Sequence, residues 1–256
     1  MKIATWNVNS LRVRLPHLLA WLDTEKPDIV ALQETKTVDE NFPLGEIHAA
    51  GYQAVFSGQK SYNGVALLSR HTATEVVRDI ENLDDPQRRV LAASYNGLRV
   101  INLYVPNGSS VDSEKYIYKL SWLEKISAWI QQQLSTHEHL IVLGDFNIAP
   151  EDRDVHDPAA WQGQVLVSDA ERAAFNHLQS LGLQDSFRLF EQHETTFSWW
   201  DYRAGAFRRN HGMRIDHILI SPALRALCTS CRIDTTPRKL ERPSDHAPVV
   251  AEFTLK

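Results

Sequence analysis

Apolar residues are grouped in short runs along the whole chain, and each run ends at a turn or at a cluster of polar residues. Continuous runs such as 29–32 and 140–143 indicate strands that are buried on both faces. Asn96-Gly97 lies between two further runs and is typical of a two-residue hairpin turn. The pattern predicts strands at 3–5, 29–32, 52–57, 65–69, 89–95, 98–104, 140–143, 215–220, 231–235 and 249–253.

Three other segments repeat their apolar residues with helical spacing. Residues 16–23 form the first, where Pro16 is tolerated because a first helical turn needs no N–H at that position. Residues 113–135 keep one continuous apolar stripe. A capping box, Ser168-Asp169-Ala170-Glu171, opens the third helix, and Gly182 ends it.

The order of these elements mixes hairpins with strand–helix alternation. Such a mixture predicts an α/β fold in which two sheets pack face to face with helices outside. No Gly-, Pro- or Ser-rich linker divides the chain, so we expect one domain over residues 1–256.

Polar clusters stand directly at the ends of four predicted strands. Side chains at the end of a buried strand face the rim of its sheet, where ligands bind. Carboxylates, amides and one imidazole suit a hard cation and phosphate, so the clusters predict a metal-dependent phosphoester hydrolase. The clusters are Trp6-Asn7-Val8-Asn9, Gln33-Glu34-Thr35-Lys36, Gly144-Asp145-Phe146-Asn147 and Ser244-Asp245-His246.

Single residues in these clusters each allow two interpretations. Glu34 is either a magnesium ligand or a salt-bridge partner, because a buried carboxylate needs one or the other. If the strand continued, Asp145 and Asn147 would point the same way, one supplying charge and the other a neutral donor to phosphate. Asn7 and Asn9 have the same spacing, although an Asx-turn before a helix explains them equally well.

A histidine and a tyrosine complete the candidate chemistry. Asp216 starts one predicted strand and His246 precedes another, so a carboxylate-oriented imidazole that acts as a base or phosphate ligand is expected. Tyr104 ends a strand, where its hydroxyl either donates to phosphate or is simply half-buried. Cys228 and Cys231 lack the further ligands of a zinc site, so we expect reduced packing residues.

Composition and charge narrow the class of protein. The apolar content of 43% and charged content of 23% are those of an ordinary globular protein. No apolar run is long enough to span a bilayer, and the first residues predict a strand, so no membrane and a cytoplasmic location are expected. A net charge of −5 argues against non-specific coating of nucleic acid. Arginines interleaved with rings still suit unstacked bases or a sugar: Trp199, Trp200, Tyr202, Arg203, Phe207, Arg208, Arg209 and Arg214.

Taken in order, the motifs resemble those of the exonuclease III family of abasic-site DNA endonucleases, within the endonuclease/exonuclease/phosphatase superfamily. They cover nearly the full chain. The motifs are Ala4-Thr5-Trp6-Asn7-Val8-Asn9, Leu32-Gln33-Glu34-Thr35-Lys36, Asn63-Gly64-Val65-Ala66, Tyr104-Val105-Pro106-Asn107, Gly144-Asp145-Phe146-Asn147, Arg214-Ile215-Asp216 and Pro243-Ser244-Asp245-His246-Ala247-Pro248.

The resemblance implies both a fold and an activity. The fold is a four-layer α/β sandwich of two packed mixed β-sheets flanked by helices. The activity is Mg²⁺- or Mn²⁺-dependent cleavage of duplex DNA 5′ to abasic sites, with removal of 3′-blocking groups and 3′→5′ exonuclease action in many members. The expected partner is duplex DNA that contains abasic sites or 3′-blocked ends, and a monomer is expected.

The resemblance also implies roles for residues at the strand ends. Glu34 resembles the principal metal ligand, and Asp245 lies at a second metal position. Asp145 resembles the group that aligns or deprotonates water. Asn7 resembles the residue that orients this water, and Asn147 resembles the hydrogen-bond donor to the transition state. Tyr104 and the dyad of Asp216 and His246 resemble the groups that bind the phosphate. Asn7 and Asp145 are also expected near the metal.

Substrate choice is expected from residues outside this set. Trp199, Met213 and Ile215 match a small apolar pocket that receives the extrahelical sugar, and Met213 stands where the pattern is often aromatic. Residues 155–169 are expected to tune the balance between endonuclease and 3′-exonuclease work. Expected contacts to DNA phosphates are Lys36, Tyr62, Asn107, Lys115 and Arg208.

Three alternatives remain at this point. The first alternative is that the chain is mainly a 3′-exonuclease. The second is that it is a phosphatase or phosphodiesterase of the same superfamily that acts on a non-DNA substrate. The third alternative is a non-catalytic nucleic-acid-binding protein. The presence of every candidate ligand disfavours this last one, because a pure binder would be free to lose some of them.

Overall fold

Two six-stranded sheets form the centre of the structure, a computed structural model that describes residues 1–81 and 83–255. The first sheet has the order β11 (Cys228–Ile233), β12 (Val249–Phe253), β1 (Lys2–Asn7), β2 (Ile29–Gln33), β4 (Val65–Ser69) and β3 (Gln53–Ser57). The second has the order β5 (Thr74–Val77), β6 (Val90–Tyr95), β7 (Leu98–Tyr104), β8 (Leu140–Asp145), β10 (Asp216–Ile220) and β9 (Gln184–Asp185).

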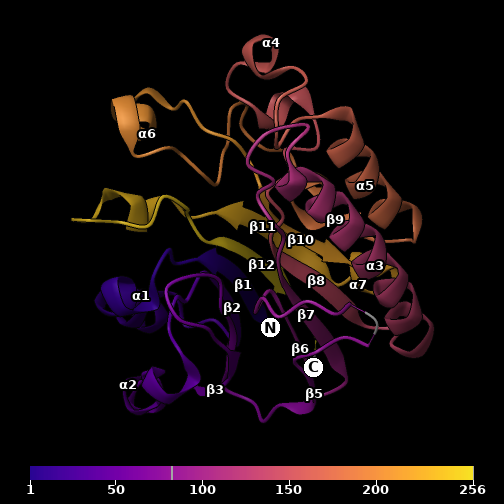
Figure 1. Cartoon of the computed structure of the whole chain (residues 1–256). Coiled ribbons are helices and arrows are strands. Elements are labelled where there is room, and N and C mark those ends of the chain that lie inside the picture. The colour runs from indigo at the N-terminus through magenta and orange to yellow at the C-terminus, as the bar shows by residue number, and fades with distance from the viewer. Residues whose placement is uncertain (82, 256) are drawn as a thin grey trace.

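Helices flank the two sheets on their outer sides (Figure 1). The α-helices are α1 (Leu11–Glu25), α2 (Leu44–Ala49), α3 (Glu114–Thr136), α4 (Pro158–Trp161), α5 (Asp169–Ser180), α6 (Ala206–Arg209) and α7 (Pro222–Arg225). Short 3₁₀ turns are η1 (Asp39–Asn41), η2 (Asp152–Asp154), η3 (Ser186–Leu189), η4 (Arg203–Gly205) and η5 (Thr236–Lys239). None of the helices in the described residues is long and apolar enough to cross a membrane.

Alternation along the strands divides the apolar residues between the layers. In β2, Ile29 and Ala31 join the cluster between the sheets, whereas Val30 and Leu32 pack with residues of α1 and α2. In β8, Ile141 joins the same inner cluster, and its neighbours pack with residues of α3 and α5. Because successive side chains of a strand point to opposite faces, continuous apolar runs here line two cores. The predicted four-layer α/β sandwich is confirmed.

Strand direction brings distant motifs to one rim of this sandwich. Strands β1 and β2 run parallel in one sheet and β7 and β8 in the other, and the last residues of β1 and β8, Asn7 and Asp145, are joined by a hydrogen bond of 2.9 Å. Asp145 at the end of β8 lies opposite Tyr104 of β7 and opposite Asp216, the first residue of the antiparallel strand β10. Polar strand ends from both sheets therefore gather at one edge.

Some boundaries differ from those that the sequence predicts. Helix α1 begins at Leu11, so Pro16 lies inside the helix and not in its first turn. Strand β11 starts at Cys228, three residues early, because a register shift near Ser230 extends its pairing with β12. The short strands β5 and β9 were not predicted, since two to four residues carry too little alternation.

Other local predictions are confirmed. The Asn96-Gly97 turn has positive φ at both residues and joins β6 to β7. Ser168 and Glu171 form the predicted capping box of α5. Cys228 and Cys231 are buried free thiols, and burial raises the pKa of Cys231 to about 12.

Candidate active site at the rim of the two sheets

The Asn7 side chain joins two carboxylates that come from different sheets. Its Nδ2 donates to Glu34 Oε1 at 3.1 Å and to Asp145 Oδ2 at 2.9 Å. Its Oδ1 accepts from the Asn9 backbone N–H at 3.0 Å, so the predicted Asx-turn is also present. The turn uses the oxygen of the amide and leaves its nitrogen for the two carboxylates.

Glu34 lies in a loop that is held in place by hydrogen bonds to the residues directly before β4. Its backbone has a φ of 52°, and the two following residues donate to the carbonyls of Gly64 and Asn63. Gly64 itself has a φ of 91°, and a Cβ there would come within 2.1 Å of Thr35 Oγ1. Only glycine allows this close approach, so the Asn63-Gly64 motif supports the position of Glu34.

The Glu34 carboxylate has two further donors. Tyr104 Oη donates to Oε1 at 2.8 Å, and Lys36 Nζ lies 2.8 Å from Oε2. Burial alone would raise the pKa of Glu34, but Lys36 and the hydrogen bonds outweigh it, so this pKa is lowered. The pKa of Tyr104 is raised well above its usual value by burial and by the charges of Glu34 and Asp145. Tyr104 therefore keeps its proton and remains a donor.

The segment after β8 places Asp145 and Asn147 differently from the sequence prediction. The strand does not continue, because Asn147 has a left-handed φ of 49° and its backbone N–H donates to Asp145 Oδ1 at 2.9 Å. The two side chains still meet, since Asn147 Nδ2 lies 3.4 Å from Asp145 Oδ2. Asn107 Nδ2 donates to Asn147 Oδ1 at 3.1 Å, which fixes the amide from the other side.

Asp216 and His246 form the predicted dyad. His246 Nδ1 lies 2.8 Å from Asp216 Oδ2, which also accepts from Ser198 Oγ at 2.6 Å. His246 Nε2 lies 3.7 Å from Asp145 Oδ2. Burial opposes a charged imidazole, but Asp216 and Asp145 outweigh it and raise the pKa of His246 to about 10. The imidazole is therefore a cation at neutral pH.

Asp145 has a raised pKa, because it is fully buried and because Asp216 and Glu34 add negative charge nearby. Asp145, Asp216 and His246 offer ligand atoms within 4.8 Å of one another, a group that could hold a metal ion. Asp216 Oδ1 is buried and has no hydrogen-bond partner among residues 1–81 and 83–255. A buried oxygen of this kind is a free acceptor at the site.

Asp245 lies beside this group and not within it. Its Oδ1 accepts from Asn9 Nδ2 at 2.9 Å and its Oδ2 from Trp199 Nε1 at 3.1 Å. Asn9 also accepts from Lys36 Nζ at 2.6 Å, so a hydrogen-bond chain connects Asp245 to Glu34.

The residues predicted to receive a sugar are packed together. Trp199 pairs as an isolated bridge with both Met213 and His246, so this packing adjoins the dyad. Met213 is 0% exposed and Ile215 is 1% exposed. They form an apolar cluster with Ala149, Val155, Leu166 and Val167, against which Trp161, Val165 and Trp199 pack.

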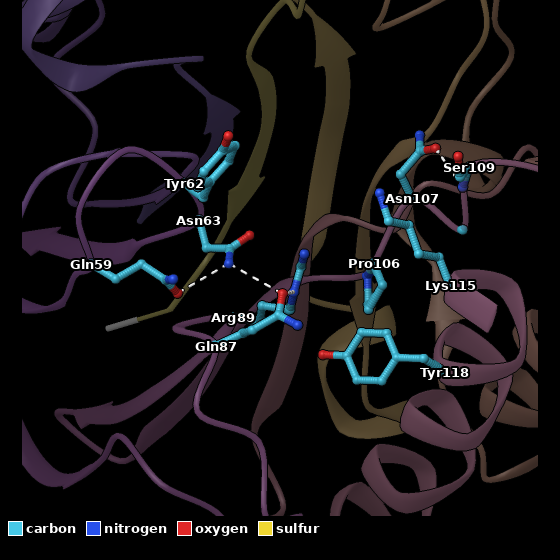
Figure 2. A pocket seen from close by; sticks show the side chains of 11 residues that line it. Gln59, Tyr62, Asn63, Gln87, Arg89, Pro106, Asn107, Ser109, Lys115 and Tyr118 are labelled. Carbon is cyan, nitrogen blue, oxygen red and sulfur yellow. Dashed lines mark hydrogen bonds between the residues drawn. The ribbon is translucent and has the colours of Figure 1, made fainter.

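Three of the five predicted phosphate contacts line one open cavity of about 460 Å³. Figure 2 shows Tyr62 and Asn63 on one side of it, with Asn107 and Lys115 on the other. Arg89 also lines it, and its guanidinium lies 4.6 Å over the Tyr104 ring. Lys36 instead binds Glu34, and Arg208 lies on α6.

The sequence did not predict that three further residues support the site from behind. Ser198 binds Asp216, and a fully buried ion pair joins Lys119 of α3 to Glu171 of α5 at 2.5 Å. Lys119 Nζ also donates to the carbonyls of Asn147 at 2.6 Å and Asn107 at 3.1 Å. A lysine within the apolar stripe of α3 was the available signal, because a buried charge needs a partner.

The rim of the four-layer sandwich thus carries three carboxylates, an imidazole with a raised pKa and amide donors. The fold and this site define an enzyme of the phosphoester-hydrolysing class. The chain belongs to the Endonuclease/Exonuclease/phosphatase family, whose model matches residues 4–246. The resemblance predicted from the motifs is confirmed.

Individual relatives are similar over the whole length. Exodeoxyribonuclease III of Haemophilus influenzae is 36% identical over 266 residues, which cover 99% of this chain and 100% of the relative. The structure of the Neisseria 3′ phosphatase NExo, bound to a product DNA hairpin, has a TM-score of 0.98 and 47% identity over 100% of both chains. An AP endonuclease from Archaeoglobus fulgidus has a TM-score of 0.96 and 40% identity, again over 100% of both chains.

Proposed function

We propose that this chain is a metal-dependent DNA repair nuclease that cleaves the backbone 5′ to abasic sites and removes groups from 3′ ends. The observation that carries the proposal is the meeting of Asn7, Glu34 and Asp145 beside the Asp216–His246 dyad. Carboxylates supply the base and the metal ligands, and the imidazolium supplies a cation for the scissile phosphate. The relatives that carry nuclease names support DNA as the substrate.

The donor set fits Mg²⁺ or Mn²⁺. Glu34 is ionised and partly accessible, and Asn7 keeps the Asp145 carboxylate next to it. The Lys36 ammonium group already binds Glu34 where a metal cation would bind it. Asp216 Oδ1 is a buried acceptor without a hydrogen-bond partner in the described part of the chain. Glu34 and Asp145 would hold the ion, the Asn7 amide nitrogen would orient both carboxylates, and Asp245 would serve a second position. When bound, the ion stabilises negative charge on the phosphate and on the leaving 3′-oxygen.

The chain's own residues divide the remaining work. Asp145 orients water and accepts its proton, because a carboxylate whose pKa is raised toward neutrality is the better base. Charged His246 donates from Nε2 to a phosphate oxygen while Asp216 fixes its ring. Asn147 and Tyr104 would donate to the oxygens on which charge develops once their donors turn from Asp145 and Glu34 to the phosphate. None of these donors needs to move its proton for the reaction.

DNA would enter through the cavity lined by Tyr62, Asn107 and Lys115 (Figure 2). Lys115 and Arg89 supply positive charge there, and Asn107 connects the cavity to Asn147. Contacts of this kind set affinity and its salt dependence more than sequence preference. Because Lys36 binds Glu34, its contact to DNA depends on release from that pair. Arg208 on the α6 loop remains a proposed contact, and the chain is proposed to act as a monomer.

The test uses a duplex oligonucleotide with one central tetrahydrofuran abasic analogue, an intact duplex, and a nicked duplex with a 3′-phosphate. Each is incubated with Mg²⁺ or with EDTA. Hydrolysis of the damaged duplexes only with Mg²⁺ is expected. Turnover of inositol phosphates or free nucleotides but not of DNA would make the chain a phosphatase of another class. DNA binding without turnover with any metal would make it a non-catalytic binder.

A narrower function, processing of 3′ ends as the main activity, is favoured by one observation. The apolar residues proposed to receive a sugar, Met213 and Ile215, are buried and form part of a filled cluster. In the same assay, this function predicts loss from the 3′ end with little internal incision. The similarity to the Neisseria 3′ phosphatase is in line with it.

A further inference from the structure

Arg238 of η5 is buried against three aromatic rings of the segment that contains α6. It is 6% exposed, and its guanidinium carbon lies 4.8 Å from the centre of the Phe207 ring and 5.8 Å from those of Trp200 and Tyr202. Trp200 and Phe207 also pack edge to face, with their ring centres 5.0 Å apart. From the sequence, these rings were expected to suit unstacked bases or a sugar. In the structure they instead surround a cation of the chain itself.

The α6 loop, residues 201–211, is attached to the rest of the chain mainly through side-chain packing. Figure 1 shows α6 on a loop that projects away from both sheets. Within the described part of the chain, hydrogen bonds of positions 203–209 reach only to Asp201 and to positions 210 and 211. Ala206 and Phe207 pack in a small apolar cluster with Phe197 and Trp200. The contact between Phe207 and the Arg238 guanidinium is therefore an important attachment of the loop.

Arg238 also binds the segment that carries two candidate site residues. Its Nη1 donates to the Ser244 carbonyl, and Asp245 and His246 follow directly. The Trp200 N–H donates to the Asp245 carbonyl at 3.0 Å, so the α6 loop begins beside the rim of the site. One guanidinium thus joins the α6 loop to the rim.

The α6 loop presents positive charge to solvent. Arg203 is paired with Asp201 at 2.7 Å, whereas Arg208 and Arg209 are exposed and form no ion pair with any described residue. Exposed arginines of this kind attract the phosphates of a nucleic-acid backbone, and each neutralised phosphate releases counterions. Because the rings beside them are occupied by Arg238, the loop offers charge to a duplex and little surface for stacking.

We propose that Arg238 is a positioning residue that docks the α6 loop against the rim, so that Arg208 and Arg209 bind backbone phosphates of the duplex. This inference rests on the proposed nuclease function and names how its DNA contact on this side of the rim is built. The rings of Trp200 and Phe207 hold Arg238 and do not stack on bases. Without Arg238, the loop keeps its two arginines but no longer holds them where the phosphates lie.

The test measures binding to a duplex with a central tetrahydrofuran in the presence of EDTA, so that affinity is separated from hydrolysis. Fluorescence anisotropy at several salt concentrations gives the slope of the logarithm of the association constant against the logarithm of salt concentration. Arg208→Gln together with Arg209→Gln should reduce this slope by up to about 1.8, because each lost phosphate contact removes about 0.9. Arg238→Gln should reduce it by a similar amount, although Arg238 is itself buried and both loop arginines remain.

Three further variants separate docking from a general loss of structure. Arg238→Lys keeps a cation beside the rings and a donor for Ser244, so it should restore most of the slope. Phe207→Leu removes a ring from the loop side of the contact and should reduce the slope as Arg238→Gln does. Arg225→Gln is the matched control, an exposed arginine on α7 after the far end of β10, and should leave the slope unchanged.

Circular dichroism first establishes that each variant is folded, and Phe207→Leu carries the test if Arg238→Gln does not fold. Combining Arg238→Gln with the two loop substitutions should add little to either, and additive losses would overturn the inference. An unchanged slope in folded Arg238→Gln would overturn it as well, and so would an unchanged slope without the loop arginines. Lower affinity of Phe207→Leu at an unchanged slope would show that the ring stacks on DNA instead. Each of these results leaves nuclease function standing, whereas failure of the wild type to hydrolyse any DNA with Mg²⁺ would reject the proposed function itself.

Discussion

Replacing Lys119 with methionine would show how far the loops of the site depend on the ion pair behind them. Lys119 Nζ binds Glu171 Oε1 at 2.5 Å and the carbonyls of Asn147 and Asn107 at 2.6 and 3.1 Å. Both side chains of the pair are fully buried. Methionine keeps the apolar stem of lysine but removes its charge and all three donated hydrogen bonds.

The cost follows from the carboxylate that remains. Glu171 would keep the donors Leu166 and Ser168, but its charge would be buried without a cation. Breaking one side of a buried pair costs about 3–5 kcal/mol of unfolding free energy. At about 2–4 °C per kcal/mol for a chain of this size, the melting temperature should fall by about 6–20 °C. The double variant K119M/E171Q should lose less than the sum of the two single losses.

Activity should also change, because two carbonyls of the candidate site lose their shared donor. At a temperature where the variant is folded, kcat should fall at least about tenfold and KM should change less, since displaced groups act mainly on the reacting geometry. Thermal and urea unfolding followed by circular dichroism, with hydrolysis of a 3′-phosphate duplex, measure both effects. Lys125→Met, an exposed lysine of the same helix, is the matched control and should stay within about 0.5 kcal/mol. A loss below about 1 kcal/mol in K119M, or additive losses in the double variant, would refute the reasoning.

Three further predictions concern the reacting groups. Glu34→Ala should raise the Mg²⁺ concentration for half-maximal activity by at least about tenfold, with partial rescue at high Mg²⁺, and an unchanged titration would remove Glu34 from the ligand role. Asp145→Asn should lower kcat by at least about 10³-fold and leave DNA affinity within about threefold, so full turnover would reject Asp145 as the base. Asp216→Asn should lower the pKa of His246 from about 10, because it removes the nearest charge that favours the imidazolium. The stability that this cation contributes is complete below a pH of about 6.5 and is lost as the pH rises through about 10. In the variant, the loss of stability and activity on raising the pH should therefore begin at a lower pH than in the wild type. A pH–rate profile that does not move would contradict this assignment.

Local signals in the sequence were sufficient for most of the elements and for the polar side chains that stand at the rim. Continuous apolar runs gave the buried strands, Asn96-Gly97 gave a hairpin, and Ser168 with Glu171 gave a helix start. These features depend on neighbours within a few residues, so they are visible without a fold. The short strand β9 could not be predicted in this way, because its existence depends on pairing with β10.

The same limit applies to the site. The sequence by itself determined which side chains stand at strand ends, because apolar runs and polar termini are properties of one segment. Tertiary structure alone decided that Asn7 meets Asp145, 138 residues away, and that Lys119 pairs with Glu171. It also decided that Leu166 fills the space beside Met213. Long-range contacts of this kind arise from the packing of whole layers, which no local pattern specifies.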